Sequence, residues 1–367
     1  MKYNWQQKDW RNFQYDTTAV EELLFEFSER TGRISGVLEG LPEAIQTETM
    51  INMMVSEAIK TSEIEGEYLS RQDVMSSIRR NLGLNPELPI SKDKKAEGIS
   101  ELMIAVRNSF KESITSETLF SWHSMLMKGS KNIAVGKWRS HEEPMQIVSG
   151  AIGREVVHFE APPSKKVTEE MQLFIIWFNN TSLEGDDIIK KPIIRAAIAH
   201  LYFESIHPFE DGNGRIGRAI SEKALSQYIQ RPILLSLSRA IEKNKKKYYD
   251  ALKKAQRSNE ITSWILYFTQ TVLEAQIQTE KEIEFTLKKT KFFDQYEQHL
   301  NERQLKVIRR MFDEGPDGFE GGMNATKYKG ITGTSKATAT RDLQNLVEKQ
   351  ILNPIGGGRS TRYEISC

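Results

Sequence analysis

The chain has 367 residues, of which 51 are basic and 50 acidic, and 38% are apolar. This length exceeds the size at which one hydrophobic core keeps growing, so we expect two or three packed units. The composition is that of an ordinary globular protein, and the nearly balanced charge points to no particular partner.

The only cysteine, Cys367, is the last residue, so an intrachain disulfide is excluded and a reducing compartment is expected. The first residues are polar and aromatic, which excludes an ordinary secretory signal. No stretch contains the roughly 18 consecutive apolar residues that a membrane span needs. We therefore expect a soluble, cytoplasmic protein without a membrane partner.

Most of the chain has a helical pattern. Apolar residues at three- and four-residue spacing predict an amphipathic helix over residues 42–60, ended by Gly66, and a second helix capped by Ser70. Helical patterns resume over residues 94–110, 116–127, 167–180 and 192–206. Residues 145–159 differ, because two short apolar segments flank a small-residue turn, and this predicts a β-hairpin.

The pattern changes again near residue 296. Helices are predicted over residues 302–312, 325–329 and 334–350, around a glycine-rich gap. We therefore expect three domains, namely an N-terminal helical module at residues 1–100, a helical core at 101–290 and a C-terminal domain at 296–367.

One loop carries the pattern of a phosphate site. His207 precedes a proline, which disfavours helical geometry, so the helix before it should end there. Gly212 and Gly214 allow the backbone to turn sharply and present its amides to an anion. The helix from about residue 215 to residue 228 adds its positive end, with Arg215 and Arg218 on one face of its first turn.

Two side chains add chemistry to this loop. Asp211 supplies a hard oxygen ligand suited to magnesium on nucleotide phosphates. The imidazole of His207 is a natural acceptor for the proton of an attacking hydroxyl. The pattern favours nucleotidyl or phosphoryl transfer; the alternative is a simple Gly-Asn-Gly turn between helices, with a packed histidine and solvated arginines.

The segment from His207 to Arg218 resembles the signature of the Fic family, H-P-F-x-x-G-N-G-R-x-x-R, at all eight fixed positions. A chance match would be on the order of 10⁻¹⁰ at about one in twenty per position. The resemblance covers about residues 116–270. It implies a mainly α fold with a β-hairpin flap, and transfer of AMP from ATP to serine, threonine or tyrosine hydroxyls of proteins.

The resemblance also implies roles for the motif residues. His207 would be the general base and Asp211 the magnesium ligand. Arg215 would neutralise phosphate charge during the displacement, and Asn213 would be a further catalytic residue. Arg218 would hold the γ-phosphate. Gly212, Asn213 and Gly214 would form the cradle around the α- and β-phosphates.

Two further segments resemble parts of the family's site. Residues 146–159 resemble the flap that pairs with the target, and Val148, Ser149 and Gly150 in it are candidate nucleotide-binding residues. Tyr248 and Tyr249 resemble the tyrosines that line the adenine pocket, although Gln256 stands where relatives often have asparagine. The alternatives are a purely structural hairpin and two tyrosines that only pack a helix.

The segment T-S-E-I-E-G at residues 61–66 resembles the family's inhibitory motif in its N-terminal placement. The resemblance implies that Glu65 pairs with Arg218 and displaces the γ-phosphate, a carboxylate competing with a phosphate for one guanidinium. The alternatives are an ordinary capping box of Ser62 and Glu65, or Glu65 as a surface charge.

The C-terminal domain resembles a winged helix-turn-helix, with a recognition helix opening at residues 333–343 and a wing at 356–363. Residues 326–363 contain seven basic and two acidic side chains, a modest footprint for duplex DNA. Our candidates for DNA contacts are Lys336, Arg341, Arg359 and Arg362. Protein docking or dimerisation is an equal alternative.

Two functions from different classes follow. The first is an autoinhibited AMP transferase that uses ATP and magnesium and modifies a protein hydroxyl, its own included. The second is a winged-helix DNA-binding regulator whose Fic core only senses nucleotide. A different phosphate-containing donor on the same scaffold is a third candidate. The sequence leaves open the target protein, the signal that relieves inhibition and the oligomeric state, with a homodimer as one candidate.

Overall fold

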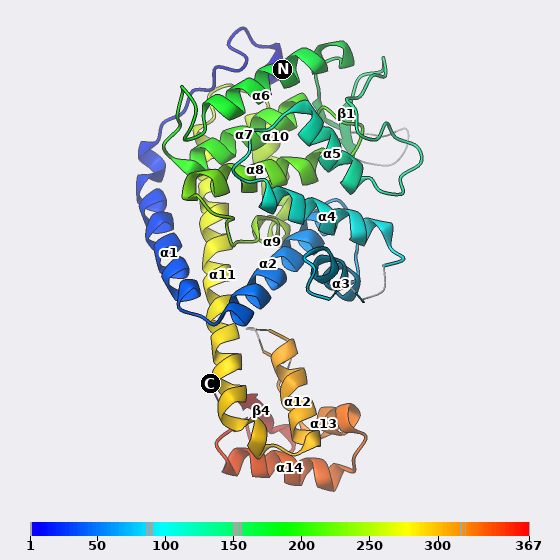
Figure 1. Ribbon diagram of the computed structural model, residues 1–367, viewed down its shortest axis with the longest axis vertical. Helices are drawn as coiled ribbons and strands as arrows, with labels where there is room; N and C mark the ends of the chain where they lie inside the picture. Colours follow the sequence, from blue (N-terminus) through cyan, green and yellow to red (C-terminus); the bar gives the residue numbers. More distant parts are fainter. Residues whose placement is uncertain are drawn as a thin grey trace. The chain divides into compact units, whose positions relative to one another are not determined.

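The computed structural model describes residues 2–85, 87, 91–149, 154, 156–315, 318–319 and 321–366. The chain divides into two compact units, Met1–Ile277 and Gln278–Cys367 (Figure 1). The expected fold class is confirmed, since both units are mainly helical and each contains one antiparallel pair of strands. Within the described residues, no helix is both long and apolar enough to cross a bilayer.

The first unit contains the hairpin and most of the helices. Its elements are α1 (Glu21–Glu39), α2 (Glu43–Ile64), α3 (Arg71–Asn81), α4 (Lys94–Asn108), α5 (Ser116–Leu126), β1 (Gln146–Ser149), β2 (Val156–Glu160), α6 (Ser164–Asn180), α7 (Pro192–Ile206), α8 (Asn213–Ile229), α9 (Leu237–Lys243), α10 (Lys245–Ala255) and the first part of α11 (Thr262–Tyr296), up to Ile277, with short 3₁₀ turns at Asn4–Gln6 and Thr18–Val20.

The centre of this unit is α7, which runs beside α8 (Figure 1). Every residue of α7 after Pro192 is buried, so the helix is covered on all sides, and its few charged or polar side chains, such as Arg195, His200 and Glu204, lie inside the protein. Pro192 stands at the first helical position, where a missing N–H costs nothing, as the sequence predicts. This packing holds the ends of α7 and α8 rigidly around the loop that joins them.

The helix α2 extends four residues beyond the predicted end, to Ile64. Ser62 lies in its last turn and donates a hydrogen bond to the carbonyl of Ala58 at 2.9 Å, so the alternative reading of Ser62 as a helix cap is wrong. The chain leaves the helix at Gly66, whose φ of +82° suits glycine. This exit places Glu65 and Glu67 on either side of one sharp turn.

The hairpin forms where the sequence predicts it. The strands β1 and β2 pair antiparallel, with a bulge between Ile147 and Val148. The predicted turn residues, Ala151 to Gly153, lie outside the described residues. The N-terminal aromatics pack on this unit: Trp5 donates its indole N–H to the carbonyl of Glu160 at 2.7 Å, and Trp10 contacts the ring of Tyr202 edge-on.

The second unit is a helix-turn-helix with two short strands. Its elements are the end of α11, a 3₁₀ turn at Glu297–His299, α12 (Glu302–Asp313), α13 (Ala325–Thr332), α14 (Lys336–Glu348), β3 (Leu352–Ile355), a 3₁₀ turn at Gly358–Ser360 and β4 (Arg362–Ile365). Asp342 of α14 accepts hydrogen bonds from Tyr328 of α13 and Arg303 of α12, both at 2.9 Å. This carboxylate therefore ties the three helices together.

The division between the compact units falls inside α11, at Ile277, and residues 1–100 share the first unit with the core. The three domains expected from the sequence stay a prediction. The helix α11 is continuous across this division. Its residues Val272 and Leu273 belong to the first core and Phe292 to the second, so no break in helical pattern marks the change.

Candidate active site

His207 directly follows the last residue of α7. Its backbone adopts a left-handed conformation with φ of +50°, and its N–H still donates to the carbonyl of Phe203 at 2.9 Å. Its own carbonyl accepts a hydrogen bond from Nε of Arg139 at 2.8 Å, and that arginine is buried. The histidine is therefore held at the mouth of the loop, as the proline after it predicts.

The loop is closed by Asn213. Its side-chain oxygen accepts from the N–H of Phe209 and its amide donates to the carbonyl of the same residue, both at 2.9 Å. Gly212 begins α8 with φ of +80°, and a Cβ there would lie 2.6 Å from Cε of Met127. Only glycine fits this position, because both the backbone conformation and the neighbouring side chain exclude a larger residue.

Both motif arginines are buried beside this loop. Arg215 and Arg218 have side chains that are 4% and 1% exposed. Nε of Arg215 and Nη1 of Arg218 have no hydrogen-bond partner among the described residues. Buried N–H donors without an acceptor are costly, so these two groups point to an anion as the missing partner.

Arg218 is held by the end of α2. Its Nε donates to the hydroxyl of Thr61 at 2.7 Å, and its Nη2 donates to Glu65 at 2.8 Å. Burial opposes the charge, but the carboxylate of Glu65 more than compensates, so the pKa of Arg218 lies above its usual value. A Cβ at Gly214 would lie 2.3 Å from Oε1 of Glu65, so this carboxylate sits directly against the glycine turn.

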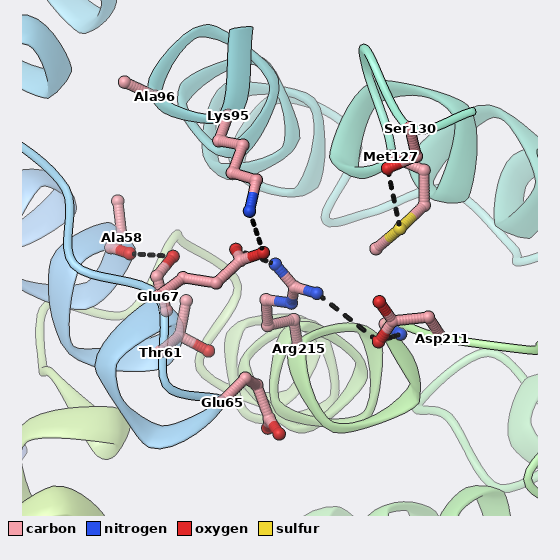
Figure 2. A network of polar contacts seen from close by, with 12 residues as sticks. Ala58, Thr61, Glu65, Glu67, Lys95, Ala96, Met127, Ser130, Asp211 and Arg215 are labelled. Atoms are coloured by element: carbon pink, nitrogen blue, oxygen red, sulfur yellow. Dashed lines mark hydrogen bonds and ion pairs between the residues drawn. The ribbon is translucent and has the colours of Figure 1, made fainter. Parts of the chain in front are cut away.

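Arg215 is held by a second carboxylate that sequence reasoning missed. Its Nη1 donates to Glu67 at 2.5 Å, and Nζ of Lys95 donates to the same carboxylate at 2.8 Å. Figure 2 shows Glu67 between the two cations, with Asp211 on the other side of Arg215 at 3.6 Å. The only available signal was an acidic residue two positions after Glu65, which gave no indication of its partner.

A third carboxylate, Glu204, lies one turn before His207 and was also missed. Its Oε2 is 3.6 Å from Nδ1 of the imidazole, and its side chain is 5% exposed. The nearby His200 is buried, and its ring contacts the hydroxyl of Tyr248 at 2.8 Å. Desolvation lowers the pKa of His200. The helical spacing of Glu204 and His207 was visible in the sequence, but their burial was not.

The predicted adenine-pocket tyrosines differ in exposure. Tyr248 is 1% exposed, whereas Tyr249 is 38% exposed. Gln256 is buried, and its amide N–H donates to the backbone carbonyl of Glu204 at 3.2 Å. This hydrogen bond stabilises the end of α7, so that N–H is already used within the protein. The packing alternative therefore fits Tyr248, while Tyr249 keeps a face open to a ligand.

The predicted flap residues are only partly described. Val148 is 47% exposed, and Ser149 pairs with Val156 through the backbone. Gly150 lies outside the described residues. The exposed valine leaves an apolar surface on the hairpin, which is compatible with an extended partner.

Asp211 is the candidate magnesium ligand. Its Oδ1 accepts the N–H of Gly212 at 2.6 Å, and its side chain is 60% exposed. Within the described part of the chain, no three His, Cys, Asp or Glu side chains gather as a metal cluster. A single exposed carboxylate beside a phosphate cradle fits magnesium that arrives on a nucleotide, because Mg²⁺ commonly takes one or two carboxylates and completes its shell with phosphates and water.

Three family models match the chain. The Fic/DOC family matches residues 113–225, which include the whole segment from His207 to Arg218. A domain of unknown function, DUF4172, matches residues 3–84, and the C-terminal domain of DIP2311-like transcriptional regulators matches residues 321–366. The last match fits the helix-turn-helix unit, as the sequence predicts.

Two curated relatives are protein adenylyltransferases. The chain is 32% identical over 147 residues to a probable protein adenylyltransferase of Aquifex aeolicus (strain VF5), covering 40% of this chain and 38% of that protein. It is 22% identical over 245 residues to the protein adenylyltransferase Fic of Nematostella vectensis, covering 65% of this chain and 51% of that protein. The chain thus spans about half or less of the length of these relatives.

The fold has a solved counterpart over nearly its whole length. The crystal structure of a Fic family protein from Desulfovibrio desulfuricans G20 matches with a TM-score of 0.58 and 19% identity, covering 96% of this chain and 97% of that one. At this identity the likeness concerns the fold. With the family match over the segment from His207 to Arg218, it leads to one conclusion: the chain contains a domain of the Fic/DOC family at residues 113–225.

Proposed function

We propose that this protein transfers AMP from ATP to a serine, threonine or tyrosine hydroxyl of a protein. The observation that carries the proposal is the arrangement of one imidazole, one glycine turn and two buried guanidiniums with unpaired donors around the start of α8. The names of the two curated relatives support the same chemistry.

In this proposal His207 accepts the proton of the attacking hydroxyl. The N-terminal amides of α8 and the turn from Gly212 to Gly214 bind the phosphates, and Arg215 stabilises the charge that develops on them. Arg218 binds the γ-phosphate once it is free. Magnesium would reach Asp211 with the nucleotide and offset phosphate charge.

The same arrangement supports a proposal of self-inhibition. Glu65 occupies Nη2 of Arg218, the guanidinium assigned to the γ-phosphate. Charge-assisted bonds of this type are strong, and each ~1.4 kcal/mol in favour of the blocked state lowers activity about tenfold. ATP would then bind with its α-phosphate turned away from attack.

The test is AMP incorporation from labelled ATP with magnesium, followed by gel and intact-mass spectrometry. We expect Glu65→Gly to raise incorporation at least about tenfold. His207→Ala in the same background should abolish it. A Glu65→Gly variant that adds no AMP to itself or to proteins in a lysate would contradict the transfer proposal, and equal labelling with and without Glu65 would contradict self-inhibition.

A second function, duplex DNA binding by the C-terminal unit, is favoured by the match to transcriptional regulators. Lys336 and Arg341 are exposed on α14, the second helix of the helix-turn-helix. The side chain of Arg359 lies outside the described part, and Arg362 lies half-buried on β4. We expect salt-dependent binding, weakened by Lys336→Ala with Arg341→Ala. A DNA affinity that changes neither with salt concentration nor with the two substitutions would contradict this function and favour protein docking.

A further inference from the structure

Glu204 is a buried carboxylate, and one of its oxygens has no hydrogen-bond partner in the described part of the chain. Its Oε1 and Nδ1 of His207 are both buried, and neither has a hydrogen-bond partner among the described residues. Its Oε2 lies 3.6 Å from that nitrogen, too far for a formed hydrogen bond. Burying a carboxylate without a hydrogen-bond partner costs free energy, so this side chain needs a donor. The structure places Nδ1 of His207 near it without forming that hydrogen bond, and catalytic hydrogen bonds often form only when substrate binds.

The other cations around Glu204 already have partners. The ring nitrogens of His200 contact the hydroxyls of Tyr248, at 2.8 Å, and Ser221, at 3.2 Å. Arg218 uses Nε and Nη2 on Thr61 and on Glu65, and its Nη1 has no partner among the described residues. The basic nitrogen that lies within ion-pair distance of the Glu204 carboxylate is Nδ1 of His207, at 3.6 Å, and this makes the imidazole the candidate partner.

Gly217 makes room for this carboxylate. A Cβ at that position would lie 2.6 Å from Oε1 of Glu204 and 3.4 Å from the ring of His200. The residue occupies an unspecified position of the motif, so the phosphate cradle itself does not demand glycine there. The close approach of α8 to Glu204 therefore depends on this glycine.

The charge of Glu204 is maintained despite its burial. Desolvation raises its pKa, but the neighbouring imidazoles and Arg218 more than compensate, so the pKa of Glu204 lies below its usual value. The titratable and charged groups that surround Glu204 and His207 come from α7, α8, α10 and the segment before β1: His200, Arg218, Tyr248, Tyr249 and Arg139.

We propose that Glu204 is the positioning residue of His207: its carboxylate accepts Nδ1–H of the imidazole and leaves Nε2 as the proton acceptor. This inference rests on the proposed function. As the hydroxyl O–H bond breaks, its proton moves to Nε2. The hydroxyl oxygen bonds to the α-phosphorus, the bond from that phosphorus to the bridging oxygen breaks, and pyrophosphate leaves. Glu204 then faces an imidazolium and stabilises its charge.

The first test is the rate of AMP transfer in the Glu65→Gly background. Glu204→Gln should reduce the plateau rate at least about tenfold, because the imidazole loses its fixed tautomer. Glu204→Asp keeps a carboxylate and should recover most of that rate. KM for ATP should stay within about twofold in both variants.

Glu170→Gln is the matched control, because it removes another largely buried carboxylate of the same unit, on α6, where it pairs with Arg11 and Trp10. It should leave the transfer rate in place. Gly217→Ala should act in the direction of Glu204→Gln, since the added methyl displaces the carboxylate. A folded Glu204→Gln variant that keeps the parent rate would overturn the proposal, and so would an equal loss of rate in Glu204→Asp, because a purely structural role predicts no rescue by a carboxylate.

A measurement that does not depend on enzyme activity separates this inference from the proposed function. Nitrogen-15 NMR of labelled histidines should show the Nδ1–H tautomer at His207 in the parent and a mixture of tautomers in Glu204→Gln. If Glu65→Gly transfers no AMP, the proposed function fails while this spectrum still tests the pair. An unchanged tautomer in the variant would refute the role of Glu204.

A different observation carries a second inference. The carboxylates of Glu65 and Glu67 flank Gly66 and hold Arg218 and Arg215, one each. Lys95 of α4 anchors Glu67 from the far side (Figure 2). We infer that Glu67 is a second inhibitory carboxylate, which occupies Nη1 of Arg215 and keeps it from a phosphate. This extends the inhibition proposed for Glu65.

The test compares Glu65→Gly with and without Glu67→Gln. The double variant should transfer AMP about three- to tenfold faster and bind a non-hydrolysable ATP analogue more tightly by a similar factor. Glu63→Gln is the matched control, because Glu63 lies in the last turn of α2, close to Glu67 in sequence, but pairs with Lys60. Analogue affinity still tests Glu67 if Glu65→Gly is inactive, and affinity that is unchanged or weaker in the double variant would refute the inference.

Discussion

At the scale of single residues, the site is defined by which polar atoms have partners and which do not. The side-chain amide of Asn213 accepts one hydrogen bond from the backbone of Phe209 and donates another to it. In contrast, Nε of Arg215 and Nη1 of Arg218 are buried without an acceptor among the described residues. The first pattern fixes a loop, and the second leaves donors for an anion. The backbone of this loop is therefore fixed by hydrogen bonds, whereas two donors of its arginines still lack an anionic partner.

The first prediction concerns Asn213. Asn213→Ala removes both hydrogen bonds to Phe209 and leaves a buried N–H unpaired, which should destabilise the fold by about 1–3 kcal/mol. Denaturant unfolding followed by tryptophan fluorescence measures the change. Asn81→Ala, at an exposed residue of α3, is the control and should stay within about 0.5 kcal/mol of the parent. Equal stability of both variants would show that the loop holds without this amide.

At the scale of elements, α2 and α8 bring acidic groups together in the interior. Glu57 of α2 is buried and accepts a hydrogen bond from the backbone N–H of Ser238 at 3.0 Å. Glu222 of α8 lies near it, and desolvation, together with the charge of Glu57, raises the pKa of Glu222 to about 8. The helix α8, which carries Arg215 and Arg218, thus also carries the carboxyl group of Glu222, whose raised pKa keeps it protonated at neutral pH.

The second prediction follows from that pKa. In the unfolded chain this carboxyl ionises near pH 4.5, whereas in the folded state it stays protonated until about pH 8. Its stabilising contribution is therefore complete below about pH 4.5 and is lost as pH rises to about 8. The melting temperature should fall between pH 6 and 9, and Glu222→Gln should flatten that slope. Parallel slopes in parent and variant would contradict the raised pKa.

At the scale of the whole molecule, two hydrophobic cores share no residue although one helix contributes to both. The first core contains Val272 and Leu273 of α11, and the second contains Phe292 of the same helix. The loop from His207 to Arg218 lies entirely in the first unit and the helix-turn-helix in the second. Each unit can therefore be stabilised or destabilised through its own core.

The third prediction uses this division. In calorimetry of Glu65→Gly, an ATP analogue at about 100 times its dissociation constant should stabilise the first unit by about 2.7 kcal/mol. Leu343→Ala, in the second core, should destabilise the second unit by about 2–5 kcal/mol and leave the first transition in place. A single transition that shifts under both changes would show that the units unfold together.

The amino-acid sequence by itself determined the mainly helical fold, the hairpin, the helix that ends at His207 and the motif of the phosphate loop. These features depend on local pattern, such as apolar spacing, a proline after a histidine and glycines at a turn. The resemblance to the Fic family likewise rests on twelve contiguous positions, His207 to Arg218. Local determinants of this kind are readable without knowing what packs where.

Only the tertiary structure decided which charges meet. Glu67 and Arg215 are separated by 148 positions, and no local pattern links them. The position of Glu204 was readable, but its burial and its unsatisfied oxygen depend on α8 approaching at Gly217. The unit boundary inside α11 was likewise invisible, because a continuous helix can pass from one core to another without a change in its pattern. Burial and pairing depend on residues distant in sequence, and they decide how the buried charges of this site interact.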